Sequence, residues 1–370
     1  MNLTPFKLER YFAKYEFSTE YLLCSSDCEA MSIEDLLALE EGADKKFQNV
    51  WLGYTESQGN PTLRKEIANI YETIQPEEIL VHAGAEEAIF LFMQAVLTQG
   101  DHVIVHAPCY QSLIEVAKGI GCDVSPWIAR EENNWALDLN DIKKLLRPNT
   151  KVIVVNIPHN PTGYLMSRAD FDSLNQFVQE NNLLLFCDEV YRESEYDPCM
   201  RLPAACDMGD HAVSLGVTSK TYGLAGLRIG WIAMKNKDVY QKMASLKDYT
   251  TICNSAPSEF LAEVAMRNRH KLIERNLGII KNNLAVMDEF IIHHSAFFNW
   301  IRPQAGSMGF PKLLQGDIED FCDKVVREAG VLLLPGTMYD DTGNHFRVGL
   351  GRKNLSQAVE RLEDFISSIR

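Results

Sequence analysis

The chain has 370 residues, of which 46% are hydrophobic and 24% are charged, and its formal net charge is −15. Single cores stop growing near roughly 250 to 300 residues, so a chain of this size predicts a globular protein with two domains. Its acidic balance repels phosphate backbones and anionic lipid surfaces, which argues against nucleic acid or a membrane as a partner.

The N-terminal segment, Met1 to Phe17, mixes five charged side chains with its apolar ones, unlike the unbroken apolar stretch of a signal peptide. The apolar run from Ala88 to Leu97 is interrupted by Gln94 and is shorter than the ~20 residues that span a bilayer. The nine cysteines include no C-x-x-C pair. We therefore expect reduced thiols in a cytoplasmic protein.

Short apolar runs rich in β-branched residues alternate with helical patterns through the middle of the chain. The predicted strands cover residues 79–81, 102–106, 151–157, 183–187, 212–217 and 227–233, and predicted helices cover 86–97, 110–118 and 170–180. This alternation predicts an α/β fold with a mostly parallel central sheet flanked by helices.

After Ala256 the pattern changes to longer helices. Helical spacing covers residues 259–294 and 354–369, with strand-like pieces at 306–312, 331–334 and 345–350. We expect a smaller α/β domain there. The predicted division is a large domain of residues 46–250 and a small domain of residues 1–45 together with 251–370.

Polar residues follow several of the predicted strands, where ligands bind in open parallel sheets. Gly84, Ala85 and Glu86 open a helix whose first N–H groups can hold a phosphate, although an ordinary tight turn has the same composition. Tyr110 follows the next strand and could stack on a flat heterocycle, as could many surface tyrosines. Asn160, in an Asn-Pro-Thr-Gly turn, offers an amide to a phenolic oxygen, or simply forms a loop.

Two further residues carry charge at strand ends. Asp188 ends a five-residue apolar strand, where a buried carboxylate is costly unless it meets a cation or a protonated ring nitrogen. Lys220 follows the strand 212–217 in a glycine-broken turn, where an amine loses its proton more easily and can form a Schiff base with an aldehyde. His102 and His106 have the spacing of helical zinc ligands, but the segment between them is a strand, so we expect core or edge histidines and no metal site.

Taken in order, Gly84-Ala85-Glu86, Tyr110, Asn160-Pro-Thr-Gly163, Asp188-x-x-Tyr191, Ser219-Lys220 and Gly226-Leu-Arg228-x-Gly230 resemble the motif series of the class I/II aminotransferases, pyridoxal-phosphate enzymes of fold type I. The resemblance spans about residues 50–350 and makes the large domain the cofactor-binding one. It implies that Lys220 forms the Schiff base with the cofactor and shuttles the proton, and that Asp188 pairs with the pyridine nitrogen. Asn160 and Tyr191 would bond the phenolic oxygen, and Tyr110 would stack on the ring.

The resemblance also assigns the phosphate and the substrate. The phosphate would sit on the backbone of Gly84, Ala85 and Glu86, with Ser219 and Arg228 adding polar contacts. Arg347 would grip the substrate α-carboxylate, and Asn160 would also contact the substrate. Tyr54 would reach the phosphate of a neighbouring subunit, which implies a homodimer with shared active sites.

Two positions depart from the family pattern. Val217 stands where many relatives have a serine, so one phosphate contact is either missing or supplied by Thr218 or Ser219. Near the N-terminus, Ser25, Ser26, Asp27 and Glu29 occupy the segment that borders the substrate in relatives. An anion there would favour a polar or cationic donor over aspartate or glutamate. Alternatively, Asp27 only caps a helix that begins near Met31 or Ser32.

These residues favour transamination between an L-α-amino acid and a 2-oxo acid. The same scaffold also serves C–S β-lyases, cyclases, decarboxylases and synthases, and it does not by itself separate them. A non-catalytic sensor that binds the cofactor is a weaker alternative. The fifty residues before Trp51 are expected to be too few and insufficiently basic for the DNA-binding domain that such regulators carry.

Overall fold

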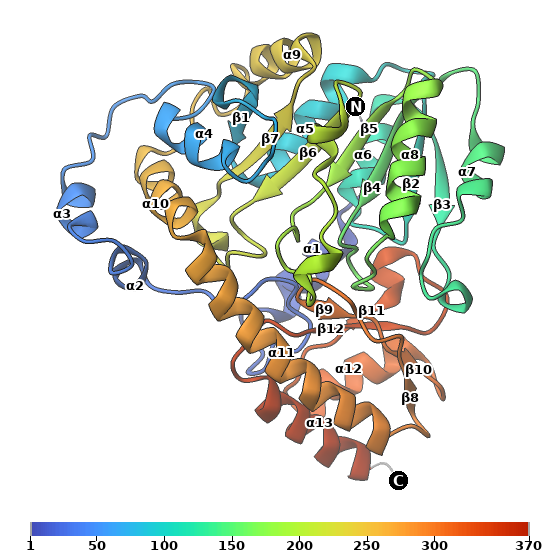
Figure 1. Ribbon diagram of the computed structural model, residues 1–370. Coiled ribbons are helices and arrows are strands. Elements are labelled where there is room, and N and C mark those ends of the chain that lie inside the picture. The colour runs from blue at the N-terminus through green and yellow to red at the C-terminus, as the bar shows by residue number, and fades with distance from the viewer. Residues whose placement is uncertain (1, 369–370) are drawn as a thin grey trace.

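The computed structural model describes residues 2–368, so Met1 and Ile369, the outer ends of two predicted segments, lie outside the described residues. A seven-stranded sheet forms the centre (Figure 1), with strands β1 (Ile79–His82), β2 (His102–Ala107), β3 (Asp123–Ile128), β4 (Thr150–Asn156), β5 (Leu184–Asp188), β6 (Ala212–Val217) and β7 (Gly230–Met234). Their order is β1-β7-β6-β5-β4-β2-β3. Only β7 pairs antiparallel with its neighbours, and the predicted mostly parallel α/β sheet is confirmed.

Helices cover both faces of this sheet because successive strand residues point to opposite sides and both sets are apolar. One face packs against α5 (Gly84–Val96), α6 (Ser112–Ile120) and α9 (Lys237–Lys247). The other face packs against α7 (Leu139–Leu145) and α8 (Arg168–Glu180), and near β1 and β7 against α4 (Pro61–Ala68) and α10 (Ala256–Arg267).

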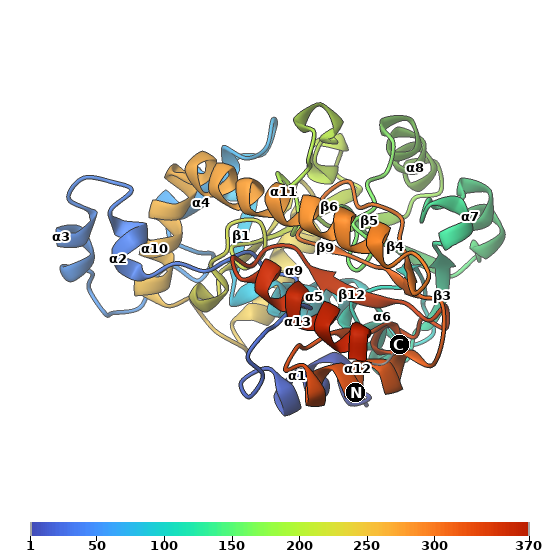
Figure 2. The same ribbon diagram turned by 90° about the horizontal axis from the view of Figure 1, so that it is seen from below.

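A second core lies below the sheet in Figure 1 and in front in Figure 2. It is built from α11 (Arg269–His293), α12 (Ile318–Glu328), α13 (Leu355–Ser368) and the short strands β8 (Phe298–Asn299), β9 (Met308–Gly309), β10 (Lys312–Leu313), β11 (Leu334–Pro335) and β12 (Phe346–Gly349). Leu23 and Cys28 from the N-terminal segment join this core. The limits of the two domains at residues 46 and 250 remain a prediction.

The N-terminal helices lie in different parts of the molecule. α1 (Lys7–Tyr15) lies between the two cores: the Tyr11 hydroxyl donates to the Leu333 carbonyl at 2.9 Å, and the Lys7 N–H donates to Gln111 Oε1 at 2.8 Å. By contrast, α2 (Ile33–Leu37) and α3 (Ala43–Gln48) project to one side of the molecule in both views. The 3₁₀ helices are η1 (Pro76–Glu78), η2 (Glu131–Asn133), η3 (Pro198–Met200), η4 (Ala205–Met208), η5 (Ala225–Leu227) and η6 (Gly336–Tyr339).

Several predicted elements differ from the structure. The edge strand β3 is absent from the predicted set, because Pro126 and its alternating exposure weaken the strand pattern. The predicted strand 227–233 begins only at Gly230, because Arg228 adopts a left-handed conformation with φ 53°. The predicted helix 259–294 is two helices that break at Asn268. Of the predicted piece 331–334, only Leu334 lies in a strand. No helix among the described residues is long and apolar enough to span a membrane.

Candidate active site

A cavity of about 410 Å³ opens beyond the carboxyl ends of the parallel strands. All predicted site residues except Gly84 and Tyr54 line it, namely Ala85, Glu86, Tyr110, Asn160, Asp188, Tyr191, Ser219, Lys220, Arg228 and Arg347. Gly84 directly precedes Ala85, which lines the cavity. Tyr54 lies away from the cavity, and its side chain is 86% exposed on the surface. The structure therefore brings together residues that are as far apart as 85 and 347 in the sequence.

One end of the cavity is suited to an anion. α5 begins at Gly84 without a side-chain cap, so the first N–H groups of the helix remain available. Gly84 has φ 83°, and a Cβ there would come within 2.6 Å of Arg228 Nη2, so the guanidinium lies against this turn. Ser219 Oγ is 3.5 Å from Arg228 Nη1. These groups form a cradle that fits a phosphate.

The residues at and after Val217 differ in what they offer to the cavity. Val217 itself lines the cavity and offers no hydrogen bond. Thr218 is fully buried, and its hydroxyl donates to the Leu224 and Ile229 carbonyls at 3.3 and 3.0 Å. Ser219 lines the cavity. Ser219 is therefore the available hydroxyl, and Thr218 has a structural role.

Asp188, at the end of β5, is a buried carboxylate with few donors. Its Oδ1 accepts one hydrogen bond, from the Val190 N–H at 3.2 Å. Burial raises the pKa of Asp188 to about 7, although the Val190 N–H and the charge of Lys220 oppose this shift. Asn156, which the sequence pattern did not indicate, donates to the Asp188 carbonyl at 2.9 Å and accepts from the Asn160 N–H at 2.7 Å. A protonated ring nitrogen would satisfy this carboxylate.

Lys220 and Tyr191 face the same space. Lys220 Nζ donates to Ser26 Oγ at 3.0 Å, and burial lowers the pKa of this amine while the charge of Asp27 opposes the shift. Tyr191 is 1% exposed, and its hydroxyl makes no hydrogen bond of normal geometry within the described part of the chain. Burial raises the pKa of this phenol, while Arg347 and the nearby Ser26 hydroxyl oppose the shift. Buried polar atoms are normally paired, so this hydroxyl fits an oxygen atom of a ligand.

Arg347 on β12 is a buried guanidinium that makes no ion pair with a carboxylate of residues 2–368. Its Nε donates to the Cys24 carbonyl at 2.9 Å. Its Nη1 donates to Asn160 Oδ1 at 3.3 Å and to the Tyr339 hydroxyl. The cation is thus held in place by neutral oxygens, which leaves it suited to a carboxylate ligand.

Four residues of the N-terminal segment line the cavity although no sequence motif marked them: Leu8, Glu9, Phe12 and Glu16. Ser25, Ser26 and Asp27 also line it, whereas the Glu29 carboxylate accepts from the Lys353 N–H at 3.0 Å. The capping interpretation of Asp27 is wrong. Ser32 caps α2 by accepting from the Asp35 N–H, and Asp27 instead pairs with Arg352 at 2.9 Å.

The histidines of β2 are core residues, as predicted. His102 bonds Thr150 and Ser125 at 2.7 and 2.9 Å, and His106 stacks on His159 with ring centroids 3.8 Å apart. Among the described residues no group of three or more His, Cys, Asp or Glu side chains could hold a metal ion.

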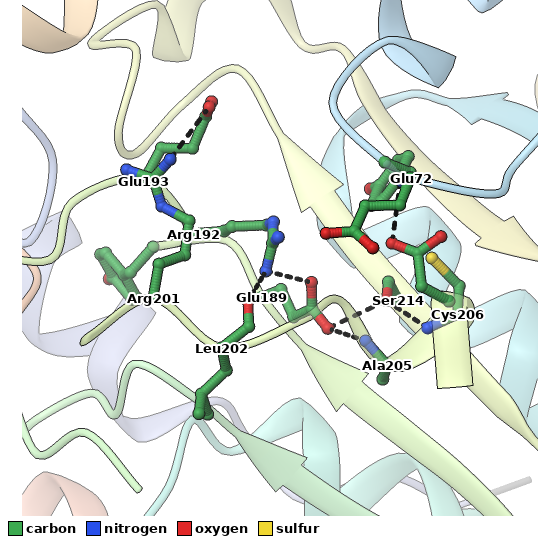
Figure 3. Close-up of polar contacts among 12 residues, drawn as sticks. Glu72, Glu189, Arg192, Glu193, Arg201, Leu202, Ala205, Cys206 and Ser214 are labelled. Carbon is green, nitrogen blue, oxygen red and sulfur yellow. Dashed lines mark hydrogen bonds and ion pairs between the residues drawn. The ribbon is translucent and has the colours of Figure 1, made fainter. Parts of the chain in front are cut away.

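Glu189, the neighbour of Asp188, belongs to a buried charged network outside the cavity (Figure 3). Its Oε1 accepts from the Ala205 N–H at 2.7 Å and from the Ser214 hydroxyl at 2.9 Å, and Arg192 lies 3.8 Å from its Oε2. Arg201 continues the network to Glu195 at 2.9 Å and to Glu193 at 3.7 Å. Arg269 lies 3.9 Å from Glu193, so three arginines face three carboxylates and the network has a structural role.

A sheet of this order, with a lysine, a carboxylate and an arginine converging beyond its strand ends, defines the pyridoxal-phosphate enzymes of fold type I. The model of the family "Aminotransferase class I and II" matches residues 21–362. The chain belongs to this family and is an aminotransferase, and the family implies pyridoxal phosphate as the cofactor.

Individual relatives cover almost the whole chain. A PLP-dependent aminotransferase from Streptococcus suis has a structure with a TM-score of 0.94 and 32% identity, covering 100% of this chain and 99% of its own. Capreomycidine synthase of Streptomyces vinaceus is 28% identical over 96% of this chain and 91% of its own length. Aspartate aminotransferase of Sulfurisphaera tokodaii is 27% identical over 90% of this chain and 86% of its own length.

Proposed function

We propose that this chain moves an amino group between an L-α-amino acid and a 2-oxo acid, using pyridoxal phosphate held on Lys220. The observation that carries the proposal is the convergence of Lys220, Asp188 and Arg347 on one cavity. When bound, the cofactor supplies an electrophilic carbonyl carbon and a ring that draws negative charge away from the substrate α-carbon.

The residues around the cavity fit this cofactor. The phosphate would lie at the start of α5, held by Gly84, Ala85, Glu86, Ser219 and Arg228. Asp188 would pair with the ring nitrogen, which would keep the carboxylate ionised despite its raised pKa. The unpartnered Tyr191 hydroxyl and Asn160 would bond the phenolic oxygen, and Tyr110 would cover a ring face.

Different residues of the chain bind the substrate, transfer its proton and exclude water. Arg347 binds the α-carboxylate through two N–H groups of its guanidinium. The Cys24 carbonyl and Asn160 hold this guanidinium in orientation. Lys220, whose pKa is lowered by burial, has a neutral amine available to accept the α-proton and return it at the neighbouring carbon. Leu8 and Phe12 provide an apolar wall that excludes water.

The proposed assembly is a homodimer with shared active sites. Tyr54 lies beside the exposed side chains of Trp51 and Leu52, and Thr55 Oγ1 donates to the Asn254 carbonyl at 3.3 Å, which joins this segment to the exposed Tyr249 and Ile252. Exposed apolar side chains gathered in this way are typical of protein interfaces. Tyr54 would then reach the partner's cofactor.

Mixed dimers test this arrangement. A dimer of a Tyr54→Phe subunit with a Lys220→Ala subunit contains one site with neither change if Tyr54 acts across the interface. Activity above the mean of the two parent dimers is expected. Activity equal to that mean, or a fully active monomer in sedimentation, would contradict the shared site.

A second candidate function uses the same cofactor without an acceptor, as a cyclase, synthase or C–S β-lyase. The similarity to capreomycidine synthase at 28% identity favours it.

The free thiols of all nine cysteines support a reducing compartment, which we propose is the cytoplasm.

One experiment separates the two functions. The purified enzyme is given a panel of L-amino acids with and without a 2-oxo acid, and the product and the cofactor spectrum are followed. Sustained turnover only with the 2-oxo acid is expected. Turnover at an equal rate without any acceptor would contradict transamination.

A further inference from the structure

Five carboxylates line the cavity, and three of them, those of Glu9, Glu16 and Asp27, belong to the N-terminal segment. Among the described residues, the cations that line the cavity are Lys220, Arg228 and Arg347. Under the proposed function these three hold the cofactor, its phosphate and the substrate α-carboxylate. No lining lysine or arginine of residues 2–368 is then left for a carboxylate in the substrate side chain.

The segment that carries Asp27 is fixed against the strand that carries Arg347. A Cβ at Gly349 would come within 2.0 Å of the Ser25 carbonyl oxygen, and one at Gly351 within 2.3 Å of the Asp27 carbonyl oxygen. The Ser307 hydroxyl donates to the Ser26 carbonyl at 2.7 Å. Only glycines permit this approach, so Asp27 holds a defined position near the substrate arginine.

Glu16, just after α1, adds a carboxylate that has no direct ion-pair partner. It is partly buried and makes no ion pair with a lysine or arginine of residues 2–368. Burial and the charge of Asp27 raise its pKa. Arg352 offsets Asp27, from which it is 2.9 Å away, but it does not line the cavity. Glu9 is exposed at the mouth, 3.5 Å from the Tyr110 hydroxyl.

A second observation points to a ligand in this cavity. The buried Arg347 guanidinium makes no ion pair with a carboxylate of residues 2–368 and donates only to neutral oxygens. We propose that the amino donor has a cationic side chain, an ammonium or a guanidinium, which Glu16 and Asp27 receive while Arg347 holds the α-carboxylate. The proposal rests on the proposed function, because it places the donor through Arg347. A side-chain carboxylate would meet like charge in a partly dry cleft and be rejected.

Matched neutral amino acids test the charge alone. The change in cofactor absorbance of the holoenzyme, without acceptor, gives the apparent Kd and the rate for L-arginine against L-citrulline and for L-lysine against L-norleucine. The cationic member of each pair is expected to have at least about tenfold higher efficiency. Glu16→Gln and Asp27→Asn should each lower that preference by about tenfold, as loss of one close charge pair does.

Glu20→Gln is the control, because Glu20 is an exposed carboxylate of the same segment and does not line the cavity. Glu16→Gln is the decisive variant if Asp27→Asn fails to fold, since Asp27 alone of the two pairs with an arginine. Equal efficiency for citrulline and arginine, or higher efficiency for L-aspartate, would overturn the cationic site and leave the proposed function standing. No spectral response to any amino acid would overturn both.

Discussion

The adjacent carboxylates of Asp188 and Glu189 are buried equally, at 5% and 6% exposure, yet they belong to two different regions. Glu189 has two hydrogen bonds to its Oε1 and an arginine within 4 Å, whereas Asp188 accepts only the Val190 N–H at 3.2 Å. The network behind β5 supplies its own counter-charges. Asp188 makes no ion pair within residues 2–368, and a buried charge without a direct partner marks a place where a ligand completes the structure.

The largest expected effect is on catalysis at Asp188. Asp188→Asn removes the charge that would hold the ring nitrogen protonated, so kcat/KM should fall by about 10²- to 10³-fold, the loss typical of one preorganised electrostatic contact. Initial rates with saturating cofactor measure it. An unchanged rate would place Asp188 with Glu189 as a structural group.

The same variant should have the opposite effect on the stability of the cofactor-free protein. The pKa of Asp188 is raised from 3.8 to about 7 on folding. The folded state therefore binds this proton more tightly, and the contribution to stability is complete below about pH 4 and lost as the pH rises through 7. Asp188→Asn should stabilise the apoprotein relative to the wild type more at pH 8 than at pH 5. Thermal unfolding at the two pH values would show no such difference if the carboxylate were already paired.

Glu189→Gln should cost stability rather than activity. It removes the counter-charge of Arg192 within the buried network, which typically costs about 3 kcal/mol of unfolding free energy. The folded fraction should keep its kcat/KM within about threefold, because the side chain does not line the cavity. Urea unfolding and rates on the same preparations would contradict this if activity fell as for Asp188→Asn.

A pair of buried tyrosines sharpens the comparison. The Tyr222 hydroxyl donates to Glu193 Oε2 at 2.9 Å, whereas that of Tyr191 has no partner among residues 2–368. Tyr191→Phe should lower kcat/KM by about tenfold with little change in stability, and Tyr222→Phe should cost about 1 to 3 kcal/mol of stability with little change in rate. The reverse pattern would refute the assignment of Tyr191 to a ligand.

The smallest effect is expected for two adjacent hydroxyls. Ser219→Ala should weaken cofactor binding severalfold, since it removes one of several contacts to the phosphate. Thr218→Val should leave cofactor affinity unchanged and lower stability by about 1 kcal/mol, because its hydroxyl bonds only backbone carbonyls. Fluorescence titration of the apoproteins with cofactor measures both. Weaker binding by Thr218→Val would show that this residue replaces the family serine.

The sequence located best those site residues that directly follow a predicted strand. Asp188 and Lys220 could be found because each follows a predicted parallel strand, and the carboxyl ends of such strands meet at one edge. Glu9 and Glu16 could not, because their place depends on α1 packing against Leu333 and Gln111, contacts with no local signature. The capping alternative for Asp27 failed for a similar reason, since its partner Arg352 is distant in the sequence.

The most direct test of the account compares two buried lysines. Lys247 is fully buried, and its Nζ donates to the Ser57 carbonyl and to Asn254 Oδ1 at 2.9 Å, whereas Lys220 faces the cavity. Borohydride reduces a cofactor–lysine imine to a stable secondary amine, which peptide mass spectrometry locates. The account predicts the cofactor mass on the peptide containing Lys220, and its loss in Lys220→Ala. A modified Lys247, or no modified lysine in cofactor-saturated enzyme, would contradict it.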